Sequence, residues 1–269
     1  MIHMVTCENR HLYEAELLEM HQLRRVHFIE ERGWSALTVR ADGGEYDACD
    51  DERTIYFLAL DGDGHVGVSM RARPTDDKCI LASVFPHLIE PSAGPVQGKD
   101  IWEISRIFAT RKNRTRAGLR RRDEVFFAAV EGAVGVGVRR LVGMIDTYLL
   151  SQAQRFPWDL RPLGLPAAYP EGEVIGVGIP TSQEELAQLQ AATGIAGSII
   201  VPVPGGPTRL TPQELERLLA AAHLPATDVT LVGHLIERIA AVQDQTSEEA
   251  LLALIDQVGA QGRGAALLH

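Results

Sequence analysis

The sequence has few cysteines and no long apolar run. Its three cysteines (Cys7, Cys49 and Cys79) form no CxxC pair. An odd number without such pairs argues against a disulfide framework and favours reduced thiols. No apolar stretch approaches the roughly 20 residues that cross a bilayer, and the first ten residues lack the apolar core of a signal peptide. We therefore expect a soluble, cytoplasmic protein.

Metal-binding spacings and a basic overall charge are also missing. The nine histidines show neither HxxxH nor HExxH spacing, so the sequence predicts no metal site. The formal net charge is −10. A surface of this sign repels phosphate, which argues against a general nucleic-acid binder. Apolar residues make up 45% of the chain, enough for an ordinary buried core.

Apolar periodicity predicts helices and strands in mixed order. Near-helical spacing predicts a helix over 11–30, with Gly33 just beyond its end. Two apolar runs, 53–60 and 65–73, flank Asp61-Gly62-Asp63-Gly64, which is typical of an antiparallel hairpin. Further strands are predicted at 100–109, 139–146, 174–179 and 198–203, and further helices at 118–134, at 148–156 and after a capping box of Thr181 and Glu184. This order predicts an α/β or α+β fold around one sheet.

The composition changes near residue 204. Pro204-Gly205-Gly206-Pro207 is a breaker cluster, and three short helices are predicted after it, at 212–223, 228–243 and 247–259. We therefore expect a main domain over 1–203 and a C-terminal helical extension over 204–269. The extension carries no chemical motif, and we interpret it as a packing or dimerisation segment.

Two clusters in the first 52 residues are candidates for a binding site. Arg24 and Phe28 share a helix face, and Trp34 follows. They would line a pocket for a flat or cationic ligand, or else serve as core with a solvated arginine. Five carboxylates then precede a strand: Glu45, Asp47, Asp50, Asp51 and Glu52. They form either a solvated acidic loop or a network that fixes an arginine or binds an ammonium group.

The strand at 100–109 carries charge inside an apolar run. Alternation places Glu103, Ser105 and Ile107 on one face, with Arg106 on the other. Charges within a central strand are costly unless they are paired. They are therefore either structural pairs or part of a site in which a desolvated Glu103 would act as general base.

A basic run follows this strand. It comprises Arg111, Lys112, Arg114, Arg116, Arg120, Arg121 and Arg122. In an acidic protein, such a run indicates a phosphate site at the following helix, an acidic protein partner, or a solvated basic face.

In this order, the clusters resemble the LuxI-type acyl-homoserine lactone synthases over roughly residues 1–200. The resemblance begins with Arg24, Phe28 and Trp34. It continues through the segments 45–50 (EYDACD), 67–75 (GVSMRARPT), 102–106 (WEISR), 156–158 (FPW) and 163–166 (LGLP).

The resemblance implies a fold similar to the GNAT acyltransferases, a twisted mixed sheet flanked by helices. It implies an enzyme for quorum sensing that takes an acyl group from acyl carrier protein or coenzyme A. The amine of S-adenosylmethionine attacks the thioester, and the methionine carboxylate then displaces methylthioadenosine to close the lactone. S-Adenosylmethionine is a substrate here, and no cofactor or metal is expected.

Roles for single residues also follow from the resemblance. It implies that Arg24, Phe28, Trp34, Asp47, Asp50 and Arg71 form the S-adenosylmethionine side, and that Glu103, Ser105 and Arg106 are catalytic, with Glu103 as base through water. The oxyanion would be stabilised by a backbone N–H at a bulged strand. The acyl carrier would dock on Arg111, Lys112, Arg114, Arg116 and Arg120.

Some choices stay open. Met144 and Asp146 are expected in the acyl pocket, where an aspartate argues against a preference for 3-oxo chains. Acyl length and the choice between acyl carrier protein and coenzyme A are not decided. One alternative is a GNAT N-acyltransferase for another amine. Its phosphate-loop pattern is not completed by Arg116-Ala117-Gly118-Leu119-Arg120. The other alternative is a non-catalytic synthase-like binding protein.

Overall fold

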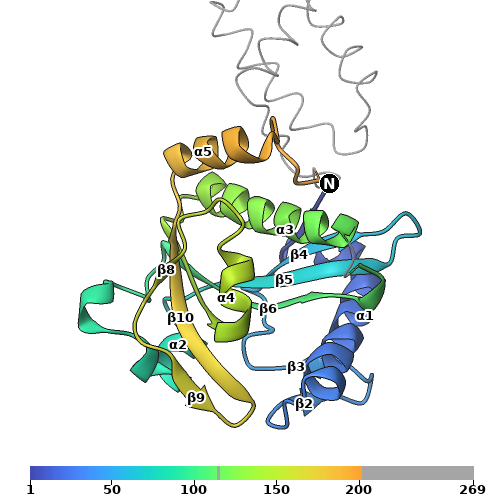
Figure 1. Ribbon diagram of the computed structural model, residues 1–269. Coiled ribbons are helices and arrows are strands. Elements are labelled where there is room, and N and C mark those ends of the chain that lie inside the picture. The colour runs from blue at the N-terminus through green and yellow to red at the C-terminus, as the bar shows by residue number, and fades with distance from the viewer. Residues whose placement is uncertain (114–115, 202–269) are drawn as a thin grey trace, which may run out of the picture. The chain divides into compact units, whose positions relative to one another are not determined.

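The computed structural model describes residues 1–113 and 116–201, with the side chains of 116–120 left out. Residues 1–201 form one compact unit built on a central sheet (Figure 1). Its strands are β1 (His3–Val5), β4 (Ile55–Leu60), β5 (Val66–Pro74), β6 (Ile101–Ala109), β7 (Arg140–Asp146), β8 (Arg161–Pro162), β9 (Ala167–Tyr169) and β10 (Gly172–Pro180). Its helices are α1 (Glu14–Arg24), α2 (Ile80–Val84), α3 (Arg116–Gly135), α4 (Thr147–Ala153) and α5 (Gln183–Thr193).

The strands lie in the order β1-β4-β5-β6-β7-β10-β8, with β9 beside β10. The pair β6 and β7 is parallel, and the other pairs of this sheet are antiparallel. A small ladder of β2 (Thr38–Val39) and β3 (Glu45–Tyr46) lies apart from it. The predicted mixed sheet flanked by helices is confirmed.

The predicted hairpin is the pair β4 and β5. Asp61 closes its turn, because its carboxylate accepts the backbone N–H groups of Asp63 and His65, each at 3.0 Å. Gly64 takes φ 85°, a left-handed conformation that glycine adopts without steric cost. The turn sequence therefore determines the register of the strands that hold the site.

Alternation along β4 divides the core between the two faces of the sheet. Phe57 and Ala59 pack with the apolar face of α3, while Tyr56 and Leu58 pack with α1 and Phe28. Figure 1 shows α3 lying along one face of β4, β5 and β6, with α1 at the far edge. A charged side chain that points away from α3 therefore meets the segments that follow α1.

The parallel strands β6 and β7 separate halfway along their length. Their pairing runs only from Ile101–Ile104 against Arg140–Gly143. On the other edge of β6, Met70 lies opposite both Arg106 and Ile107, which is a β-bulge, and Arg106 has φ 52°. The bulge turns β6 away from β7, and a cavity opens between them.

Several sequence predictions need correction. The predicted helix 11–30 begins at Glu14 and changes after Arg24 to a wider π-type turn over Arg25–Glu31. Ser182, not Thr181, caps α5 by accepting the N–H of Glu185, because the Thr181 hydroxyl donates to the carbonyl of Val138 instead.

The predicted strand 198–203 is reduced, within the described residues, to a single bridge between Ile200 and Ile2. The predicted domain boundary at 203/204 and the three C-terminal helices lie outside the described residues. Among the helices that the structure describes, none is long and apolar enough to span a membrane.

Candidate active site

A network of three arginines and three carboxylates lies on the α1 face of the sheet. Arg24 holds Glu45 through Nε at 2.6 Å and Asp50 through Nη1 at 2.7 Å. Arg71 binds both oxygens of Asp47, at 2.6 and 2.9 Å, and reaches Asp50 at 3.0 Å. The side chains of Arg24 and Arg71 are 0% and 1% exposed. Charges buried this deeply need partners of opposite sign.

Arg106 completes this network. Its Nη2 lies 2.9 Å from Glu45 Oε1 and 2.8 Å from Asp47 Oδ2. Arg71 also donates through Nε to Ser105 Oγ at 3.0 Å. Strict alternation had placed Ser105 and Arg106 on opposite faces, and that prediction is wrong because the bulge turns both toward Asp47 and Arg71. Of the charged network expected from the resemblance, Asp47, Asp50, Arg71 and Arg106 are brought together in space, whereas Glu103 binds the backbone of α2 instead.

The arginines control the protonation of the carboxylates. Burial alone would raise the pKa of Asp50, but Arg71 and Arg24 hold it far below its usual range. Burial also opposes the charge on Asp47, and the hydrogen bond from Arg71 keeps its pKa low. Tyr56 donates its hydroxyl to Asp50 at 2.9 Å, and burial raises the pKa of that phenol. Asp47 and Asp50 are therefore fixed anions and weak proton acceptors.

Phe28 and Trp34 form an aromatic wall next to the network. Their rings stack with centroids 4.9 Å apart. The Arg106 guanidinium lies 5.6 Å from the Phe28 centroid and 5.9 Å from that of Trp34. Such a wall suits a flat or cationic ligand. Of the three residues that the sequence placed in one pocket, Phe28 and Trp34 line the cavity described below, whereas Arg24 is fully buried and does not.

Glu103 is placed differently from the sequence interpretation. Its two carboxylate oxygens accept the backbone N–H groups of Ile80 at 2.8 Å and Leu81 at 2.6 Å, at the beginning of α2. It is 4% exposed and is not among the residues that line the cavity. Burial raises the pKa of Glu103, although these hydrogen bonds oppose the rise. Glu103 is thus the more basic carboxylate, but it lies behind the cavity wall.

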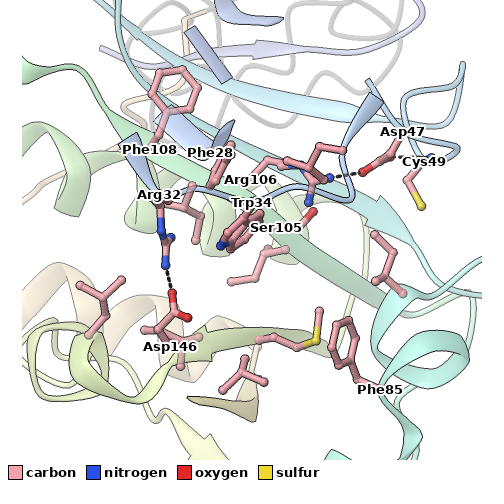
Figure 2. A pocket seen from close by; sticks show the side chains of 18 of the residues that line it. Phe28, Arg32, Trp34, Asp47, Cys49, Phe85, Ser105, Arg106, Phe108 and Asp146 are labelled. Carbon is pink, nitrogen blue, oxygen red and sulfur yellow. Dashed lines mark hydrogen bonds and ion pairs between the residues drawn. The ribbon is translucent and has the colours of Figure 1, made fainter. Parts of the chain in front are cut away.

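The cavity between β6 and β7 has a volume of about 1180 Å³. It exceeds the roughly 300–1,000 Å³ typical of a site for one small molecule. Figure 2 shows Trp34, Ser105 and Arg106 on one side and Asp146 on the opposite side. Its apolar lining includes Ile80, Val84, Phe85, Ile104, Met144, Leu149 and Val174. The space suits two substrates, one of which carries an apolar group.

Met144 and Asp146, which the resemblance places in the acyl pocket, both line this cavity. The Asp146 carboxylate is bound by Arg32 from across the cavity and by the Tyr169 hydroxyl at 2.5 Å. Sequence reasoning missed Arg32 and Tyr169. No sequence spacing would have found them, because Arg32 lies 114 residues from Asp146.

The predicted docking residues are only partly described. Arg111 and Lys112 are 81% and 76% exposed and pair with Glu31 and Asp61. Arg114 and the side chains of Arg116 and Arg120 lie outside the described residues. Arg122, which was not assigned to docking, lines the cavity beside Phe126.

Comparison with known proteins identifies relatives of the whole unit. The family model described as "Autoinducer synthase" matches residues 8–189. An isovaleryl-homoserine lactone synthase of Bradyrhizobium diazoefficiens is 38% identical over 167 residues, which cover 62% of this chain and 74% of that protein.

Solved structures agree with this match. BjaI, a CoA-dependent acyl-homoserine lactone synthase with SAM and isopentyl-CoA, aligns with a TM-score of 0.67 and 33% identity, covering 75% of this chain and 92% of that one. MesI, another CoA-dependent acyl-homoserine lactone synthase, aligns with a TM-score of 0.64 and 29% identity, covering 75% and 99%.

Proposed function

Because the chain belongs to the autoinducer synthase family and is an enzyme, we propose that it acylates S-adenosylmethionine and closes an N-acyl-homoserine lactone. One arrangement carries this proposal. A network of arginines and carboxylates that pair with one another lies beside the stacked rings of Phe28 and Trp34, at a cavity large enough for two substrates. Its parts match the demands of an amino acid that carries a cationic sulfur and a nucleoside.

The S-adenosylmethionine side is the wall of Phe28, Trp34 and Asp47. The stacked rings of Phe28 and Trp34 suit the flat nucleoside and the sulfonium cation. Asp47, a fixed anion that lines the cavity, suits the α-ammonium group. Arg71 and Asp50 hold Asp47 in place, and Arg24 in turn binds Asp50.

The first reaction step joins the two substrates. The amine loses a proton, and its lone pair attacks the thioester carbonyl. The C–S bond of the thioester then breaks and the thiol leaves. Following the resemblance, Glu103 is the base in this step and acts through water, because it lies behind the cavity wall. Its raised pKa, beside the lowered values of Asp47 and Asp50, agrees with this role. Backbone N–H groups at the Arg106 bulge stabilise the oxyanion.

The second step closes the ring. A carboxylate oxygen of the acylated substrate attacks the carbon bonded to the sulfonium, and the C–S bond breaks to release methylthioadenosine. The sulfonium accepts the bonding electron pair and becomes a neutral thioether, so this step requires no base. Ordered walls that hold the carboxylate near this carbon supply the rate advantage of an intramolecular reaction.

We assign coenzyme A as the donor carrier and a short, branched apolar acyl group as the cargo. The relatives described above support this choice, since one is an isovaleryl-homoserine lactone synthase and two are CoA-dependent. The apolar side chains around Met144 suit such a group. Dimerisation through 204–269 stays a prediction.

The test is an assay of the purified full-length protein with S-adenosylmethionine and a panel of thioesters. The panel pairs isovaleryl, straight-chain and 3-oxo acyl groups with coenzyme A and with acyl carrier protein. Mass spectrometry should detect methylthioadenosine and lactone in equal amounts, with isovaleryl-CoA as a preferred donor. If no donor yields methylthioadenosine, the proposed reaction is contradicted. If thioesters of acyl carrier protein are preferred over those of coenzyme A, only the donor assignment is contradicted.

A further inference from the structure

One ion pair crosses the cavity. Arg32 follows the π-type turn that ends at Glu31, and Asp146 is the last residue of β7. Both side chains line the cavity, and Figure 2 shows the guanidinium of Arg32 reaching across it to Asp146. The pair therefore connects the aromatic wall to the strand that forms the opposite wall.

Asp146 is anchored from two sides. Arg32 Nη2 donates to its Oδ2, while the Tyr169 hydroxyl donates to its Oδ1 at 2.5 Å. The residue is 6% exposed. A carboxylate at this depth is stable only with such partners, so its position fixes the position of the cation that it binds. Both oxygens have donors from the protein, and the acyl group is not needed to satisfy them.

Arg32 in turn contacts the aromatic wall. Its guanidinium carbon lies 4.9 Å from the Trp34 ring centroid and 5.9 Å from that of Tyr148. Trp34 is therefore held by Phe28 and Arg32 together. The guanidinium is planar and suits stacking on an indole, which a compact ammonium does not.

We propose that Arg32 and Asp146 are positioning residues for the S-adenosylmethionine wall, with Asp146 acting through Arg32 on the ring of Trp34. This inference rests on the function proposed above. By this inference Asp146, which lies on β7 across the cavity from the aromatic wall, controls the affinity for S-adenosylmethionine. This control also distinguishes the pair from an acyl-specificity device, which would alter only the response to the donor.

The experiment measures the binding of methylthioadenosine and of S-adenosylmethionine to the full-length protein by calorimetry, which requires no turnover. The variants are Arg32→Gln, Asp146→Asn and the double variant. Each single variant should raise both dissociation constants about tenfold, since small displacements of a binding wall are costly. The double variant should bind no more weakly than either single one, because the two residues act as one unit.

The matched control is Arg161→Gln. Arg161 forms an exposed pair with Asp159, at 70% and 36% exposure. Its loss should leave both dissociation constants unchanged. Thermal unfolding should show that each variant is folded. If Asp146→Asn does not fold, Arg32→Lys tests the same point, because it keeps the charge but loses the planar stack on Trp34. Arg32→Lys should bind methylthioadenosine and S-adenosylmethionine about as weakly as Arg32→Gln.

Kinetics with the acyl donor supply the second readout. The KM for S-adenosylmethionine should rise in Arg32→Gln and Asp146→Asn, and Asp146→Glu should recover part of the loss. Unchanged affinity for S-adenosylmethionine in Arg32→Gln would overturn the inference, as would an Asp146→Asn variant altered only in the KM for the donor. A wild-type protein that binds neither nucleoside would instead contradict the proposed function itself.

Discussion

The two walls of the cavity differ in how their charges are balanced. On the network wall, Arg24, Arg71 and Arg106 find their partners in Glu45, Asp47 and Asp50. On the β7 wall, Asp146 takes its cation from across the cavity. The charges of the first wall are therefore balanced within that wall, while the charge of Asp146 on the second wall is balanced by Arg32 from the opposite side of the cavity. Substitutions on the network wall should accordingly cost more.

Removal of Arg71 should have the largest effect. Arg71→Met leaves Asp47 and Asp50 buried with fewer cations, and breaking a buried ion pair costs about 3–5 kcal/mol. Urea unfolding should show a loss of this size in the free energy of unfolding. The matched variant Arg139→Gln removes an arginine that is 81% exposed and should change little. A similar loss in both variants would contradict the contrast between buried network and surface pair.

Glu103→Gln should reduce turnover about 10²–10⁴-fold, the usual contribution of a general base. The amide retains an oxygen for the N–H of Leu81 and leaves that of Ile80 facing an NH₂ group, so only a modest loss of stability is expected. The measurements are kcat for lactone formation and the thermal midpoint. A rate near that of the wild type would remove Glu103 from the base role and leave it the structural task of anchoring α2.

Acid should weaken the network wall through His21. This ring stacks on Tyr46 at 3.8 Å and bonds the Glu45 carbonyl, and burial, with Arg24 nearby, lowers its pKa from 6.5 to about 4. Between pH 6.5 and about 4, His21 is therefore protonated in the unfolded chain but neutral in the folded chain. The corresponding stability is complete above pH 6.5 and is lost as the pH falls to about 4, on the order of 3 kcal/mol.

Unfolding curves recorded between pH 7 and 4 test this dependence. The variant His21→Gln should flatten the curve in that range, because the group that titrates only in the unfolded chain is gone. Asp47 and Asp50 have lowered pKa values, so their contribution is lost only at still lower pH. An equally steep curve in His21→Gln would show that another group is responsible.

Met144→Ala on the β7 wall should have the smallest effect. The shorter side chain enlarges the apolar end of the cavity, and one or two methylene groups change discrimination by about 1–3 kcal/mol. We expect the ratio of kcat/KM for a six-carbon over a four-carbon acyl thioester to rise about tenfold. The affinity for methylthioadenosine should not change. A change in that affinity would mean that the two walls are coupled through Met144 as well.

Local sequence signals predicted the parts of the fold that depend on neighbouring residues. The β4–β5 hairpin followed from its Asp-Gly turn, and α3 followed from its apolar period. Glu103 and Arg106 stood out because they interrupt an apolar strand, whereas Arg71 was assigned to the site only through the resemblance. Alternation failed at Arg106, since a bulge arises from pairing with another strand. The cap moved to Ser182 because a distant carbonyl, that of Val138, took the Thr181 hydroxyl.

Pairs that join distant segments were not predictable. The partners of Glu103 are backbone N–H groups, which every residue but proline carries, so no side-chain pattern points to Ile80 and Leu81. Arg32 is one arginine among many, and its role depends on Asp146, which is brought close to it only when β7 joins the sheet. Such contacts arise only once the tertiary structure has formed.

The charged network also has a consequence for folding kinetics. Its members come from α1, from 45–50, from β5 and from β6, so none of its ion pairs is local in the sequence. Each pair requires long loops to close first, and contacts of this kind form slowly. A partly folded chain must therefore bring Arg24 and Arg71 out of water before all their partners have arrived. We expect this barrier to make assembly of this half of the sheet all-or-none, so that the substrate wall forms complete or not at all.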